Sequence, residues 1–218
     1  IIDMKDTITE AACTILKEQA RKINYGIKLY AGHHDEMDDI RDIILGVIKY
    51  NENASNSNPF IIKNMIASDI NSLYDNINQN DTNYSYNYAI NKLLPIGYID
   101  DDSINLWHKA SNFLFENAYF NYNGNIYKIM NSQIQGTKSG GDCCMMALNV
   151  MECKYKEKSN ELLALRMRYK DDLYMIPKIE IKNETELNEK ILSVLYPGFE
   201  FESSLNAESV SYTHLTLP

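Results

Sequence analysis

The stretch that decides the fold is residues 163–177, which read LALRMRYKDDLYMIP. Apolar side chains alternate with polar or basic ones over residues 163–169, the pattern of a half-buried strand. Residues 173–176 form a second apolar run, which predicts a partner strand. Lys170-Asp171 is therefore expected to occupy a tight turn. A hairpin tip of this kind carries Asp171 and Asp172 toward the same neighbour.

A third aspartate, Asp69, ends an earlier run, Phe60–Ile70, that reads as a largely buried strand. Three carboxylates would then converge at one point of a sheet. Unit charges ~4 Å apart repel by roughly 4 kcal/mol at an effective dielectric near 20. We therefore expect bound cations, and Mg2+ is the cation that suits carboxylate ligands beside phosphates. An aspartate that caps a turn is the alternative interpretation of Asp69.

A glycine-rich segment, Gln133–Gly141, precedes a Met-rich run that predicts a helix through Glu152 and Tyr155. Backbone amides that approach a helix in this way can bind phosphate or cradle a nucleotide. The segment lacks the Gly-Lys-Ser/Thr ending of a P-loop. A flexible loop before a helix is the alternative interpretation.

The rest of the chain predicts a mixture of helices and antiparallel strands. Asn123-Gly124 between aromatic runs indicates a hairpin over residues 119–129. Residues 78–87 are polar and read as a loop. Two further helices are expected over Thr9–Lys22 and over residues 37–48. Another is expected from a cap at Asp102 or Ser103 to Ala118, and a fourth from a cap at Asn183 to a stop at Pro197-Gly198. A last strand is expected over Phe199–Phe201. This order favours an α+β fold with a mostly antiparallel sheet.

Composition limits the functional classes. The 218 residues carry a net charge of −9, which argues against a simple nucleic-acid-binding module with a basic face. No window approaches ~18 consecutive apolar residues, so no membrane partner is expected. The four cysteines lack CxxC spacing, which fits a reducing, intracellular compartment, with nucleus and cytoplasm both open.

Together and in this order, the motifs resemble the palm domain of reverse transcriptases over about Phe60–Phe201. The stretch Asp69–Ile77 (DINSLYDNI) is similar to the first palm motif of Penelope-like and group II intron enzymes. The stretch 119–140 is similar to the second motif with its preceding hairpin, and Asn149 and Glu152 fall where that motif's helix has Asn and Glu. Arg168–Asp172 (RYKDD) is similar to the YxDD catalytic hairpin.

The resemblance implies an α+β polymerase palm, a mostly antiparallel sheet flanked by helices, with incomplete fingers and no thumb. It implies a partial fingers or connector segment at residues 1–58 and a palm at 59–209. Residues 210–218 look like a translated sequencing adapter and are set aside as an artefact. The implied activity is that of an RNA-directed DNA polymerase from a retroelement, of which this fragment alone would be inactive.

The resemblance also implies roles for individual residues. Asp69, Asp171 and Asp172 would be the catalytic carboxylates and would bind two Mg2+ ions, with Mn2+ as a substitute. Four residues would contact substrate: Tyr74, which would exclude a ribose 2′-hydroxyl, Gln135 and Gly136 in the nucleotide pocket, and Tyr169 at the primer end or template. The partners would be an RNA template, a DNA or RNA primer and dNTPs, with protein partners unassigned.

Two alternatives stay open at this stage. One is a viral-type RNA-dependent RNA polymerase, which shares the palm. The other is a degenerate, non-catalytic polymerase-like module that only binds nucleic acid. Two departures from the family pattern motivate the second: Gly141-Asp142 stands in place of the usual Ser-Pro, and Lys170 in place of a small or apolar residue.

Overall fold

The computed structural model describes residues 7–31, 66–130, 132–133 and 137–205. These residues form two compact units, each made from separate stretches of the chain. The helical unit combines residues 7–31 with Ser72–Lys154, and the sheet unit combines residues 66–71 with 155–205. The boundary expected near residue 58, the helix expected at 37–48 and the segment 210–218 lie outside the described residues.

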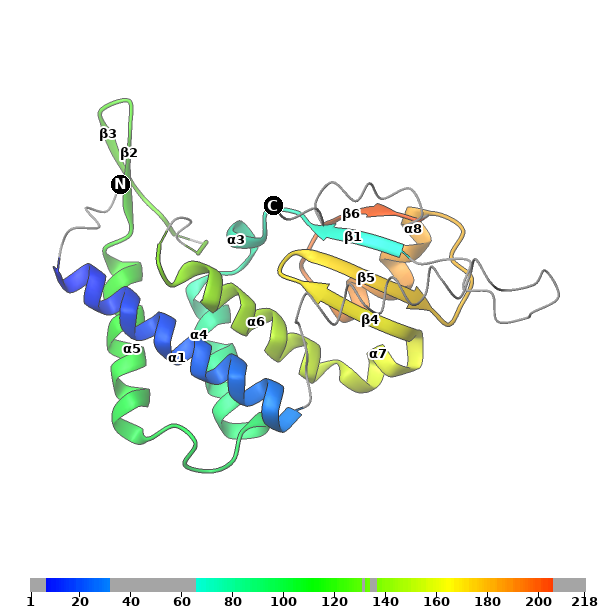
Figure 1. Cartoon of the computed structure of the whole chain (residues 1–218). Helices are drawn as coiled ribbons and strands as arrows, with labels where there is room; N and C mark the ends of the chain where they lie inside the picture. The colour runs from blue at the N-terminus through cyan, green and yellow to red at the C-terminus, as the bar shows by residue number, and fades with distance from the viewer. Residues whose placement is uncertain (1–6, 32–65, 131, 134–136, 206–218) are drawn as a thin grey trace, which may run out of the picture. The chain divides into compact units, whose positions relative to one another are not determined.

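The helical unit is built around a long first helix (Figure 1). Its elements are α1 (Thr7–Ala31), α3 (Leu73–Asn76), α4 (Gln79–Tyr88), the π-helical turn η1 (Ala89–Leu93), α5 (Asp101–Glu116), the hairpin strands β2 (Tyr119–Tyr122) and β3 (Asn125–Lys128), and α6 (Gly140–Lys154). Helix α1 packs against both α5 and α6. The hairpin at 119–129 and the helix after the glycine-rich segment are confirmed.

Helix α4 contradicts the prediction of a loop over residues 78–87. Asn78 caps it: its side chain accepts from the backbone N–H groups of Asn80 and Asp81, and Asp81 accepts from the backbone of Asn78 in return. This capping box satisfies helix donors that have no partner within the helix. The helix then buries Tyr86, which supplies the apolar contact that its polar composition hides.

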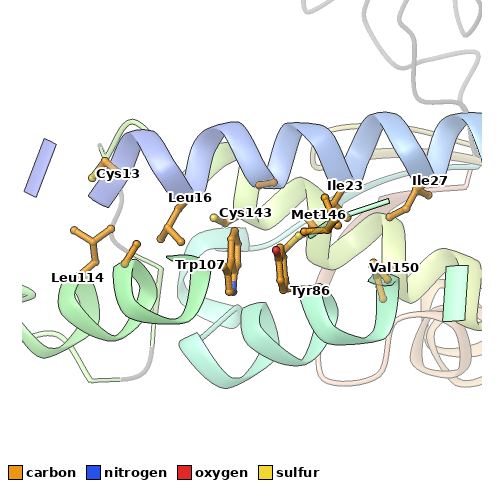
Figure 2. Close-up of a cluster of buried hydrophobic side chains, with 14 of the residues drawn as sticks. Cys13, Leu16, Ile23, Ile27, Tyr86, Trp107, Leu114, Cys143, Met146 and Val150 are labelled. Carbon is orange, nitrogen blue, oxygen red and sulfur yellow. The ribbon is translucent and has the colours of Figure 1, made fainter. Parts of the chain in front are cut away.

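The core of the helical unit is centred on Trp107 (Figure 2). Its indole stacks on Tyr86 with ring centroids 4.2 Å apart and planes 4° from parallel, and its Nε1–H donates to Asn83 Oδ1 at 2.9 Å. The Tyr86 hydroxyl donates to Gln19 Oε1 on α1. Burial raises the pKa of Tyr86 well above its usual range. These bonds tie α1, α4 and α5 together in one orientation.

The sheet unit holds a four-stranded sheet of order β4-β5-β1-β6, antiparallel at every pairing. The strands are β1 (Ile66–Ile70), β4 (Leu163–Tyr169), β5 (Asp172–Pro177) and β6 (Phe201–Ser204). Its helical segments are α7 (Lys156–Leu162), α8 (Glu184–Leu187), the π-helical turn η2 (Asn188–Leu192) and α9 (Ser193–Leu195). The predicted pair of strands around Lys170-Asp171 is confirmed.

One face of this sheet is covered by the segment α8–α9, drawn in orange behind the strands (Figure 1). Asn183 begins that segment as predicted, accepting from the backbone N–H of Glu186 at 2.9 Å. Tyr196, which is fully buried, meets Phe201 of β6 edge-on, with ring centroids 5.6 Å apart. The last strand begins at Phe201 and not at Phe199, because the Phe199 N–H turns back to the Tyr196 carbonyl.

The fold is α+β, with an antiparallel sheet flanked by helices, as the sequence predicted. Within the described ranges, no helix is both long and apolar enough to cross a membrane.

Candidate functional site

The turn between β4 and β5 carries the Asp-Asp pair. Tyr169 and Asp172 are register partners, so Lys170 and Asp171 alone form the turn. Lys170 has a positive φ of 53°, as the first position of a primed hairpin turn requires. Its ammonium lies 5.3 Å from the Tyr169 ring centroid. The turn places Asp171 at the tip and Asp172 at the first position of the returning strand.

A row of side chains crosses the sheet at this end. Asp172 is paired with Asp69 on β1, and Asp69 is paired with Glu202 on β6. Directly paired residues point to the same face, so Tyr169, Asp172, Asp69 and Glu202 form one row across four strands. Asp69 and Glu202 are exposed, and Asp171 and Asp172 are half-buried. The structure places Asp69, Asp171 and Asp172, the three carboxylates that the sequence predicted to converge, at the same end of one sheet.

Glu202 was not predicted from the sequence. It joins the row because β6 pairs with β1 in the register that sets Glu202 opposite Asp69. The run FEFESS around it alternates polar and aromatic residues, which identifies a strand. No local signal specifies which residue of β1 this strand will face, because the two strands are far apart in the chain.

Main-chain hydrogen bonds hold the ends of the strands around the carboxylates. The N–H of Ile70 donates to the Asp171 carbonyl at 3.1 Å, and the N–H of Asn71 donates to the Glu200 carbonyl at 3.0 Å. Burial and the negative charge of Asp172 raise the pKa of Tyr174, two residues along the same strand. Because β1 is hydrogen-bonded to a strand on each side, the carboxylates project from a backbone that is held in place.

The three carboxylates of the row, from Asp172, Asp69 and Glu202, are chemically suited to a hard divalent cation, which prefers oxygen ligands. Like charges directly opposite one another on a sheet are destabilising, so a cation would relieve the row. Among the described residues, however, no group of three or more His, Cys, Asp or Glu is arranged to hold a metal ion. Asp69, Asp172 and Glu202 share a face without forming a closed ligand set.

Tyr74 lies in the helical unit, on α3, next to the start of α6. A Cβ added at Gly141 would stand 3.3 Å from the Tyr74 hydroxyl, so the absence of a side chain at Gly141 makes room for that hydroxyl. The backbone N–H of Gln133 donates to the Tyr74 carbonyl at 2.8 Å, and its buried side chain donates to Thr82 Oγ1. This anchors the chain just before Gln135 and Gly136, which themselves lie outside the described residues.

The acidic residue Asp142, which departs from the family pattern, has a cationic partner. Arg21 Nε on α1 lies 3.0 Å from Asp142 Oδ1, and the Asn24 side chain donates to the Asp142 carbonyl at 3.3 Å. A second ion pair joins Lys138 to Glu10 on the same helix. Helix α1 thus contacts both ends of residues 138–142. The charge of Asp142 is partly offset by Arg21 within the helical unit.

Asn149 and Glu152, which the resemblance picked out on the same helix, are both buried. The Asn149 side chain donates to Asn24 Oδ1 on α1 at 3.0 Å. The structure therefore gives Asn149 a packing role between α6 and α1.

No protein-family model matches this sequence, and no curated protein matches it either. Solved structures do resemble its fold. Telomerase from Candida tropicalis in complex with a TWJ fragment of telomeric RNA aligns with a TM-score of 0.60 at 17% identity, covering 89% of this chain and 33% of that one. Apo telomerase from the same organism aligns at 0.57 with 16% identity, covering 92% and 37%. The chain thus spans well under half the length of these neighbours, and the likeness shows that its fold is shared with part of these telomerase structures.

Proposed function

We propose that this chain is part of an RNA-directed DNA polymerase of a retroelement, of Penelope-like or group II-like type. The observation that carries the proposal is the carboxylate row of Asp172, Asp69 and Glu202 beside the Asp171 turn, in a fold of the reverse-transcriptase kind. Asp69, Asp171 and Asp172 are the proposed catalytic and cation-binding residues. Glu202 is the additional carboxylate that borders them.

Two Mg2+ ions, or Mn2+ in their place, would lower the pKa of a primer 3′-hydroxyl and neutralise charge on the departing pyrophosphate. The side chains have separate tasks in this scheme. Asp69 and Asp172 come from paired strands and offer carboxylates from a rigid sheet. Asp171 offers a third carboxylate from the turn. Tyr169, at the end of the same row, is proposed to contact the primer end or the template.

The helical unit is proposed to select the nucleotide. Tyr74 is a flat side chain beside Gly141, and we assign it the exclusion of a ribose 2′-hydroxyl, which would favour dNTPs. Gln135 and Gly136 are proposed to contact the incoming nucleotide. The template would be RNA and the primer DNA or RNA.

A non-catalytic polymerase-like module is the second candidate. It is favoured by one observation, that the described residues hold no ready group of three metal ligands. The two candidates differ in whether the carboxylate row binds a divalent cation.

Cation binding by the 218-residue chain tests the proposal directly. Mg2+ at about 100 times its Kd should raise the free energy of unfolding by about 2.7 kcal/mol. Asp69→Asn and Asp171→Asn should remove most of that increase, whereas Glu180→Gln, an exposed carboxylate in the same unit, should preserve it. Equal Mg2+ stabilisation in all three variants would favour the non-catalytic module.

Primer extension tests the chemistry and needs the complete reading frame. We expect extension on an RNA template with Mg2+ and dNTPs, abolished by Asp171→Asn. Tyr74→Ala should admit rNTPs while retaining dNTP use. Preference of the unmodified protein for rNTPs would indicate an RNA-dependent RNA polymerase instead.

A further inference from the structure

A buried arginine lies beneath the Asp171 turn. Arg168, on β4, is 2% exposed and is paired with Leu173 of β5, so it belongs to the face that α8–α9 covers. Its neighbour Tyr169 lies on the other face, in the carboxylate row. Burying a guanidinium is costly unless hydrogen bonds satisfy it. Arg168 therefore needs hydrogen-bond acceptors at its buried position.

The turn supplies one such acceptor. The Nη1 of Arg168 donates to the Lys170 carbonyl at 2.7 Å, a short charge-assisted bond. On the other side of the turn, Ile70 N–H of β1 donates to the Asp171 carbonyl at 3.1 Å. The two bonds hold the carbonyl groups that precede and follow the Asp171 α-carbon. Together they restrict the backbone from which the Asp171 carboxylate projects.

The conformation of Lys170 makes this restraint important. A lysine at φ 53° lies in the left-handed region, which costs roughly 1–2 kcal/mol for a residue with a Cβ. Rotation of Lys170 about φ would relieve that cost and move the Lys170 carbonyl away from Arg168. The bond from Arg168 opposes this rotation, because its loss would leave a buried cation with one fewer acceptor.

We propose that Arg168 is a positioning residue for Asp171: through the Lys170 carbonyl it holds the turn in the form that presents the Asp171 carboxylate to a divalent cation. This inference rests on the proposed function, since it assigns cation binding to Asp171. Arg168 does not contact the cation. Residues that orient a metal ligand in this indirect way typically change metal affinity by about 10–100-fold when they are replaced.

Arg166 provides a matched control on the same strand and the same face. It is two residues from Arg168 and is paired with Met175, and its Nη1 is buried with no hydrogen-bond partner among the described residues. Arg166→Met and Arg168→Met therefore remove the same charge and volume from neighbouring positions. Only the second removes the bond to the turn.

The experiment measures Mn2+ binding to the 218-residue chain by electron paramagnetic resonance. Arg168→Met should weaken binding at least about tenfold, Arg166→Met less than about twofold, and Arg168→Lys should recover part of the affinity. Amide hydrogen exchange of Ile70, whose N–H donates to the Asp171 carbonyl, should speed up in Arg168→Met alone. In the background of Asp171→Asn, Arg168→Met should cause no further loss.

The outcomes separate this inference from the proposed function. If Asp171→Asn weakens Mn2+ binding but Arg168→Met matches Arg166→Met, the positioning role is wrong and the cation site stands. If none of these variants changes Mn2+ binding, the proposed function fails as well. If Arg168→Met does not fold, Arg168→Gln decides: unchanged Mn2+ affinity together with unchanged Ile70 exchange would overturn the positioning role.

Discussion

Two hairpins in the described part of the chain each begin a two-residue turn with a residue at positive φ, but they reach this conformation in opposite ways. The β2–β3 hairpin turns at Asn123-Gly124, with φ 52° and 81°, and every residue of its strands is exposed. The β4–β5 hairpin turns at Lys170-Asp171, with φ 53° at Lys170, inside a four-stranded sheet. The first turn is specified by local chemistry. The second is imposed by its surroundings.

The two turns are stabilised by different interactions. Asparagine and glycine accept positive φ at little cost, so Asn123-Gly124 forms a turn on its own. A two-stranded hairpin is marginally stable in isolation, and β2–β3 relies on contacts such as the Phe120–Tyr127 stack, with centroids 5.3 Å apart. Lysine is a poor residue for that φ. Pairing with β1 and the bond from Arg168 compensate for it.

Shortening one side chain in each hairpin should give the largest difference in the free energy of unfolding. Leu173→Ala in β5 removes a side chain that is 1% exposed, and we expect a loss of about 2–5 kcal/mol in the free energy of unfolding. Ile126→Ala in β3 removes one that is 74% exposed and should cost under about 0.5 kcal/mol. Urea denaturation measures both. Similar losses would mean that β2–β3 is buried in solution.

Removing the buried guanidinium should have the next largest effect. Arg168→Met leaves the Lys170 carbonyl without its donor, and we expect a loss of about 1–3 kcal/mol. Arg166→Met removes a buried Nη1 that has no partner in the described part of the chain, so it should be neutral or stabilising. Denaturation without divalent cations checks both. A larger loss in Arg166→Met would contradict the assignment of the turn to Arg168.

Exchanging turn residues should have smaller effects of opposite sign. Lys170→Gly relieves the left-handed strain and should stabilise the sheet unit by about 0.5–1 kcal/mol. Gly124→Ala places a Cβ at φ 81° and should destabilise β2–β3 by about 1 kcal/mol without affecting the rest of the chain. Amide exchange within each hairpin reports these changes. Destabilisation by Lys170→Gly would show that the lysine side chain contributes more than its backbone costs.

The smallest effect concerns pH. The pKa of Tyr174 is raised above the usual 10.0, by burial and then by the charge of Asp172, so the folded protein holds this proton more tightly than the unfolded chain. This contribution to stability is complete below pH 10 and is lost as the pH rises through the folded pKa. Absorbance at 295 nm follows the titration. Asp172→Asn should lower the Tyr174 pKa, and Tyr174→Phe should flatten the alkaline decline in stability.

Sequence patterns predicted the elements whose signals are local. The alternation over residues 163–177, the Asn123-Gly124 turn and the cap at Asn183 each rest on neighbouring residues, and the structure contains all three. Helix α4 escaped prediction although its cap at Asn78 is a local signal, because its main apolar contact is the burial of Tyr86 against Trp107. A polar segment does not reveal such a partner, which lies elsewhere in the chain.

By itself, the sequence determined that two aspartates would sit at a hairpin tip and that the chain would mix helices with an antiparallel sheet. Only the tertiary structure decided that Glu202 extends the row past Asp69 and that Arg168 reaches the turn from the opposite face. The physical reason is the range of the interactions. Side-chain alternation and turn chemistry act over a few residues, whereas strand register and the burial of a charge depend on segments that meet only after folding.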